Sequence, residues 1–252
     1  MKKLIILIWL LGVGIGYSQS IINTESILMD IDSTSTINFN IEGDLKYGNI
    51  KLIEFNNQFT YAKKFGRKLI RLSLGHEYLE EDDEKLANDW VGQARLNHYL
   101  GLNSIFAFAQ IQNAISLNLK SRYLFGGGYR QNLYTSKKDD SNYFDLSAGV
   151  FRELETYGQE NYADLKIENW RYSFSAFSNF NFYKNFSLNT SVYYQLNSAN
   201  LKDARFFVEP RLYYKQNNFS IYLTNRYRYH STPYVPVKKE DQEYLFGLEV
   251  SL

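Results

Sequence analysis

The stretch FSIYLTNRYRY, residues 219–229, decides the fold class, because its side chains alternate in character with a period of two. One face of the extended chain carries apolar and aromatic residues and the other carries polar and basic ones: Phe219, Ile221, Leu223, Tyr227 and Tyr229 against Ser220, Thr224, Arg226 and Arg228. Strands favour aromatic and β-branched residues, so we interpret the stretch as a β-strand. Its polar face mixes small, uncharged and charged side chains, as expected for a surface in contact with water.

The same alternation recurs along most of the chain, and helical periodicity is scarce. It predicts about twelve strands, at residues 34–46, 50–61, 68–79, 89–100, 103–112, 115–130, 142–154, 163–180, 185–197, 202–215, 218–230 and 242–252. The fifth and sixth are the least defined, because residues 114–130 contain no obvious turn.

Three features favour a transmembrane barrel over a soluble β-sandwich. The alternating runs span about 10 to 15 residues, whereas strands of globular proteins usually have about 5 or 6. The polar faces suit a wet lumen, and aromatic residues gather near the run ends, as in the girdles at a membrane interface: Tyr61, Tyr78, Trp90, Tyr99, Tyr183, Tyr229 and Tyr244. Because every backbone group in lipid must be paired, such a sheet has to close. We therefore predict an all-β, antiparallel up-and-down transmembrane β-barrel of about twelve strands.

Composition excludes several other classes of protein. The chain has 252 residues and no cysteine, so it contains no disulfide framework, cysteine nucleophile or cysteine metal ligand. Its formal net charge of +1 gives no electrostatic reason to expect a nucleic-acid partner. The mean hydropathy of −0.40 excludes a bundle of membrane-spanning helices.

The N-terminus predicts the compartment. Lys2 and Lys3 precede an apolar stretch from Leu4 to Gly16, and small residues stand at Gly16 and Ser18. This is the layout of a secretory signal peptide, so we expect a signal peptide at residues 1–18, a periplasmic segment at 19–33 and the barrel at 34–252. Export with this barrel places the protein in the outer membrane of a Gram-negative cell envelope. We expect contacts there with lipids and lipopolysaccharide, and with the barrel-assembly machinery during insertion.

Four stretches resemble the outer-membrane family called domain of unknown function 481, which includes salt-induced outer-membrane proteins. They are GDLKYGN at residues 43–49, FGGGYR at 125–130, LSAGVFR at 146–152 and VKKEDQEYLFGL at 237–248. Their order and spacing cover the chain from about Gly43 onward. The resemblance implies an outer-membrane barrel and implies no reaction or substrate.

Candidate binding residues lie on the polar faces of the predicted strands. They are Arg71, Arg95, Arg171, Arg205, Arg211, Arg226, Arg228 and Glu209. One interpretation is a basic track, in which arginines replace the hydration of small anionic solutes. The other is an interior filled by salt bridges, because narrow barrels fill their lumens and buried charges must pair.

The histidines give little support to catalysis or metal binding. We expect His76 and His98 to face lipid on adjacent strands, about 20 Å apart, which is too far to share a metal. A lipid hydrolase would need a serine, a histidine and an acidic or amide partner within hydrogen-bond reach. His76 and His230 have Ser73 and Ser231 near them in sequence, but no motif links them.

Some loop and strand residues carry local expectations. The acidic run at residues 80–84 is expected on a long outer loop, either binding divalent ions or simply solvated. Pro210 falls inside a strand and predicts a β-bulge. Pro233 and Pro236 stiffen the last outer loop, which we expect to fold over the mouth of the barrel.

The sequence therefore leaves three functions open. The first is a narrow pore or structural barrel with an arginine-lined lumen. The second is a non-conducting accessory subunit of a larger outer-membrane complex, and the third, less favoured, is an outer-membrane lipid hydrolase. We expect no cofactor and no metal in any of them.

Overall fold

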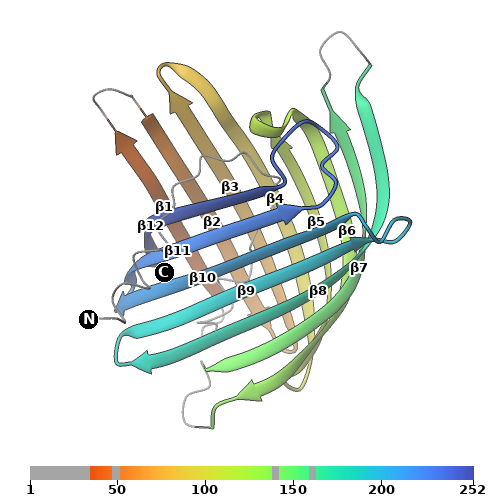
Figure 1. Cartoon of the computed structure of the whole chain (residues 1–252). Coiled ribbons are helices and arrows are strands. Elements are labelled where there is room, and N and C mark those ends of the chain that lie inside the picture. Colours follow the sequence, from red (N-terminus) through yellow and green to blue (C-terminus); the bar gives the residue numbers. More distant parts are fainter. Residues whose placement is uncertain (1–34, 47–51, 138–141, 159–162) are drawn as a thin grey trace, which may run out of the picture.

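The computed structural model describes residues 35–46, 52–137, 142–158 and 163–252 as one closed barrel (Figure 1). Its twelve antiparallel strands pair with their neighbours in chain order, and β1 pairs with β12. The strands are β1 (Ser35–Lys46), β2 (Leu52–Phe65), β3 (Lys68–Glu81), β4 (Glu84–Leu100), β5 (Asn103–Ala114), β6 (Leu119–Thr135), β7 (Tyr143–Tyr157), β8 (Leu165–Tyr183), β9 (Phe186–Asn197), β10 (Ala204–Gln216), β11 (Phe219–His230) and β12 (Glu240–Ser251). The predicted fold class and strand number are confirmed.

Side chains alternate across the wall of the barrel. Apolar side chains such as Leu74, Phe174 and Leu223 are about half-exposed on the outside, where a bilayer would cover them. Arginines, carboxylates, asparagines and serines occupy the inside. Among the described residues, no helix is both long and apolar enough to cross a membrane. The expected signal peptide and periplasmic segment lie outside the described residues.

The predicted strand boundaries need two corrections. The charged run expected to form a long loop at residues 80–88 belongs to β3 and β4, which meet at a tight turn. Asp82 and Asp83 form that turn with φ of 48° and 67°, a left-handed conformation that aspartate tolerates. The sixth strand begins at Leu119 rather than at residue 115, because the short helix η2 (Ile115–Leu117) and the left-handed Asn118 turn the chain there.

Pro210 does not form the predicted bulge. It faces Thr190 of β9 in regular register, and the register with β11 is the same on both sides of it. The ladder with β11 pairs Val208 with Tyr227 and then Arg211 with Thr224, and it skips the two residues between them. The hydroxyl of Thr224 donates to the carbonyl of Pro210 at 3.1 Å, so this part of the sheet keeps a bond without a proline N–H.

The two ends of the barrel differ in the length of their connections. The start of β1 and the C-terminal Leu252 lie at the end of the barrel where two-residue turns join the strands (Figure 1). These turns are Gly66-Arg67, Gly101-Leu102, Lys184-Asn185 and Asn217-Asn218. The β6–β7 connection at the same end is longer, and the β3–β4 turn at the opposite end is short. Long connections mark the outer end of such barrels and short turns the periplasmic end. We therefore call the end with the β7–β8, β9–β10 and β11–β12 loops the outer mouth.

The seam between β1 and β12 is reinforced from β11. Tyr222 pairs with Gly247 of β12, and Gly247 pairs with Glu42 of β1. A Cβ on Gly247 would overlap the Tyr222 ring, so only glycine lets that ring lie across β12. The Tyr222 hydroxyl then donates to Glu42 at 2.7 Å. Arg226 also reaches Glu42, at 2.8 Å.

Replacing Tyr222 with phenylalanine should weaken this seam. The ring would stay, but a buried carboxylate would lose a donor, which costs about 1.5–3 kcal/mol. We expect a lower urea midpoint, followed by tryptophan fluorescence in detergent. Tyr227→Phe is the matched control, because that hydroxyl makes only an exposed bond to Glu240. Equal midpoints for the two variants would show that the seam does not depend on this bond.

Candidate functional site

The lumen of the barrel is balanced in charge. Among the described residues, eight arginines and eight carboxylates are buried: Arg71, Arg95, Arg122, Arg130, Arg171, Arg205, Arg211 and Arg228 with Glu42, Asp145, Glu153, Glu155, Asp203, Glu209, Asp241 and Glu249. A buried charge is costly unless a partner and hydrogen bonds compensate it. This balance supports a salt-bridged interior more than a basic track.

All eight residues singled out from the sequence point into the lumen. Seven of them are buried, and the Arg226 side chain is only 13% exposed. Arg71 donates to Asn97 at 3.3 Å, and the Arg95 guanidinium lies 4.0 Å from the centre of the Phe106 ring. The other five arginines form ion pairs with carboxylates. Contact with an anionic solute stays a prediction for all of them.

Glu153 on β7 is the centre of one cluster. It accepts from Arg171 Nε of β8 at 2.7 Å and from Arg205 Nη1 of β10 at 2.5 Å. Strands β8 and β9 separate β7 from β10, so the second bond crosses the lumen rather than following the wall. Arg122 of β6 pairs with the neighbouring Glu155. These side chains fill this part of the barrel and tie its walls together.

Glu42 and Glu209 are the centre of a second cluster. Arg226 donates to Glu209 at 2.9 Å as well as to Glu42. Arg211 of β10 pairs with Glu209 and lies 3.6 Å from Glu42. Arg228 on β11 binds Asp241 at 3.1 Å and also pairs with Glu243, both on β12. A cavity of about 110 Å³ lies beside this cluster.

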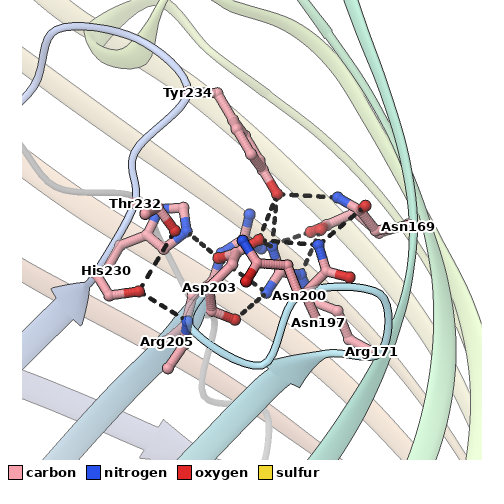
Figure 2. Close-up of polar contacts among 12 residues, drawn as sticks. Asn169, Arg171, Asn197, Asn200, Asp203, Arg205, His230, Thr232 and Tyr234 are labelled. Carbon is pink, nitrogen blue, oxygen red and sulfur yellow. Dashed lines mark hydrogen bonds and ion pairs between the residues drawn. The ribbon is translucent and has the colours of Figure 1, made fainter.

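Asp203, in the loop between β9 and β10, joins the first cluster to the outer mouth (Figure 2). It accepts hydrogen bonds from Arg171 at 2.7 Å, Tyr234 at 2.6 Å and Asn197 at 3.1 Å, and it lies 2.7 Å from His230 Nε2. Burial alone would raise the pKa of Asp203. The bonds with His230 and Tyr234 and the charge of Arg171 outweigh it, so this pKa lies well below its usual range.

Tyr234 belongs to the β11–β12 loop, residues 231–239, and its ring reaches down to Asp203 (Figure 2). Its hydroxyl also accepts from Arg171 and Asn169, each at 2.9 Å. Burial raises the pKa of Tyr234, so the hydroxyl keeps the proton that it donates to Asp203. One side chain of the loop thus bonds to two residues of β8 and to one residue of the β9–β10 loop.

The β11–β12 loop also makes apolar contacts across the mouth. Tyr234, Val235 and Val237 pack against a buried cluster from β5, η2, β6 and β7: Ala114, Leu117, Leu119 and Tyr157. Four strands separate β12 from β5 on the shorter way around the barrel, so the loop spans the opening, as Figure 1 shows. We call residues 231–239 the lid. The lid occupies the position expected from Pro233 and Pro236.

Several residues of these clusters were not identified from the sequence. Arg122 and Arg130 lie within the strand predicted at residues 115–130 but were not singled out, and Glu155 was missed because it was placed in a loop. Glu42 and Asp203 occupy polar-face positions of the predicted strands 34–46 and 202–215, so the alternation could have indicated them, but it does not indicate their partners. Their role depends on bonds between strands and loops that are not neighbours.

The histidines and serines do not form a hydrolase site. His76 lies on the outer surface, stacks on Trp90 with ring centres 4.1 Å apart, and bonds to Asn88. His98 faces Lys68 across the β3–β4 pair, well away from His76. The Ser231 hydroxyl is held by backbone groups, donating to the Lys202 carbonyl and accepting from the Ala204 N–H. Within the described part of the chain, no group of three or more histidine or acidic side chains is arranged for a metal.

Residues 34–252 match the family model described as protein of unknown function, DUF481. The chain belongs to the DUF481 family. No curated protein matches the sequence.

Solved outer-membrane barrels share the fold of this DUF481 protein. The NanC porin has a TM-score of 0.53 at 11% identity, with 85% of this chain and 100% of that chain covered. The translocator domain of the autotransporter NalP from Neisseria meningitidis has a TM-score of 0.51 at 11% identity, with 90% and 91% covered. At this identity the similarity shows the fold alone, that of an outer-membrane β-barrel.

Removing one lumen arginine should cost far more stability than removing an exposed cation. Arg205→Met leaves the carboxylates of Glu153 and Glu155 with fewer partners, and breaking a buried ion pair costs about 3–5 kcal/mol. Lys120→Met is the control, since its pair with Asp164 is exposed and worth at most about 1 kcal/mol. Urea unfolding of both variants tests this. A loss for Arg205→Met as small as that for Lys120→Met would contradict a tightly paired lumen.

The contribution of Asp203 should be the same at neutral and mildly acid pH. A carboxyl whose pKa is lowered on folding stabilises above its unfolded pKa, about 3.9, and loses that effect only as pH falls through its folded pKa. The stability lost in Asp203→Asn should therefore be equal at pH 7.5 and pH 5. A loss that shrinks markedly at pH 5 would show that the carboxylate is not held by these bonds.

Proposed function

We propose that this outer-membrane barrel is a gated, narrow channel that rests closed. The observation that carries the proposal is the lid, which packs across the mouth on the cluster of β5, η2, β6 and β7. Its Tyr234 hydroxyl also bonds to Asp203, Arg171 and Asn169. A loop that only capped a strand pair would not need to extend from β11 and β12 to the apolar cluster of β5, η2, β6 and β7. Below the lid, bonds such as Arg205–Glu153 cross the lumen and narrow any path for solutes.

The pairing of arginines with carboxylates bears on selectivity. A basic track needs arginine charge that is available to the solute, whereas five of the seven predicted arginines already face carboxylates. A small passing solute would have to replace these bonds. Preference for small anions is therefore a secondary part of the proposal, to be measured as ion selectivity once the channel opens.

A structural barrel that never conducts is the second candidate, and the equal number of buried arginines and carboxylates favours it. Such a lumen serves as a filled core, as in other small barrels. The role of accessory subunit in a larger outer-membrane complex stays a prediction. A lipid hydrolase is not proposed, because the geometry around Ser231 and the histidines gives no nucleophile.

Planar-bilayer recording of Tyr234→Phe distinguishes the channel from the structural barrel. The wild type should show rare, small conductance steps, and the variant should open more often because the lid loses its bond to Asp203. Tyr229→Phe is the control. Tyr229 lies near the outer end of β11 but faces lipid, so this variant should behave like the wild type. Silence of both wild type and Tyr234→Phe at high protein load would contradict the gated channel and support the structural barrel.

A further inference from the structure

A pocket of about 390 Å³ lies at the outer rim, between the lid and the ends of β8 and β9. Its walls include Asn169 of β8, Asn197 of β9, Asn200 of the β9–β10 loop, and Thr232 and Tyr234 of the lid. Figure 2 shows these side chains around Asp203. We call this the rim pocket.

The rim pocket is lined by groups that both donate and accept hydrogen bonds. Each asparagine amide offers two N–H donors and a carbonyl acceptor, and each hydroxyl can do either. The amides hold each other in place, since Asn197 donates to Asn169 at 3.1 Å and Asn169 donates to Tyr234. Sites that combine an aromatic ring with a few fixed polar groups are typical of small-ligand binding.

The charges around the rim pocket do not favour an ion. Asp203 already accepts from Arg171, Tyr234 and Asn197, so its carboxylate has little capacity for a cation. Glu168 forms an ion pair with Arg152 on the outer surface, and Lys166 is the one cation among the lining residues. A lining of amides and hydroxyls with balanced charge fits a neutral ligand with many hydroxyl groups.

We propose that the rim pocket binds a neutral saccharide unit. Sugar hydroxyls would exchange hydrogen bonds with Asn200, Asn169 and Thr232, and a sugar face would pack on the Tyr234 ring. The sugar could belong to a free saccharide or to the lipopolysaccharide that surrounds an outer-membrane barrel, because both present the same chemistry.

Binding at the rim pocket would also act on the lid. The pocket exists only when Thr232 and Tyr234 of the lid lie against the rim, so a ligand that fills it binds the closed state more tightly than the open state. Such a ligand shifts the equilibrium toward the closed state. This part rests on the proposed gated channel, whereas saccharide binding itself does not.

Isothermal titration calorimetry on the full chain in lipopolysaccharide-free detergent tests the binding. The probes are glucose, galactose, N-acetylglucosamine and the core oligosaccharide released from lipopolysaccharide. We expect saturable binding of at least one probe, weakened about tenfold in Thr232→Val and in Asn200→Leu, as for the loss of one hydrogen bond. Asn218→Leu, at a periplasmic turn, should bind like the wild type.

The outcomes distinguish a free saccharide from lipopolysaccharide as the ligand, and they test the saccharide site separately from the gated channel. Binding of a monosaccharide supports a free sugar as ligand, and binding of the core oligosaccharide alone supports lipopolysaccharide. Heats that do not saturate with any probe, or that are unchanged in both rim variants, would overturn the saccharide site. Bound saccharide should reduce openings in planar bilayers. Saturable binding to a protein that never conducts would leave the site standing and overturn only the gated channel.

Discussion

The constraint on which the structure depends is that a sheet in lipid cannot leave a strand edge unpaired. Closing that edge places alternate side chains in a narrow interior. Buried aromatic side chains such as Phe177, Phe207 and Tyr213 fill part of this interior. The polar groups that fill the rest must form hydrogen bonds and ion pairs with one another. In this chain the arginine–carboxylate clusters provide these partners. Glu42 serves both requirements, because it lies at the β1–β12 seam that closes the sheet and also pairs with charges in the lumen.

The lumen clusters and the lid form one connected network. Arg171 bonds to Glu153 in the lumen and to Asp203 at the mouth, and Asp203 bonds to Tyr234 of the lid. A change at the lid therefore reaches the charges inside the barrel through two side chains. Removing the tyrosine hydroxyl would also leave Asp203 and Arg171 with fewer partners, so lid position and lumen packing are expected to change together.

The strand pattern was readable from the sequence because alternation, turn residues and length are local properties. The alternation also indicated which face of each strand points into the lumen. It therefore predicted that Arg171, Arg226 and the other candidate residues point inward. The partners were not readable, because Glu153 meets Arg205 only when β7 and β10 curve around a lumen. The tight turn at Asp82 was missed for a local reason, since a run of acids suggests a solvated loop even where two residues suffice.

The bonds at Glu42 join residues that are far apart in the chain. Tyr222 and Arg226 lie 180 and 184 positions from Glu42, whereas Arg205 lies 52 positions from Glu153. Contacts between distant segments form late in folding, because the long loop between them must be closed first. The cluster around Glu153 joins β6, β7, β8 and β10 and contains no residue of β1 or β12. The bonds of Glu42 to Tyr222 and Arg226 exist only when the first and last strands meet, so they are the side-chain contacts that depend on closure of the barrel.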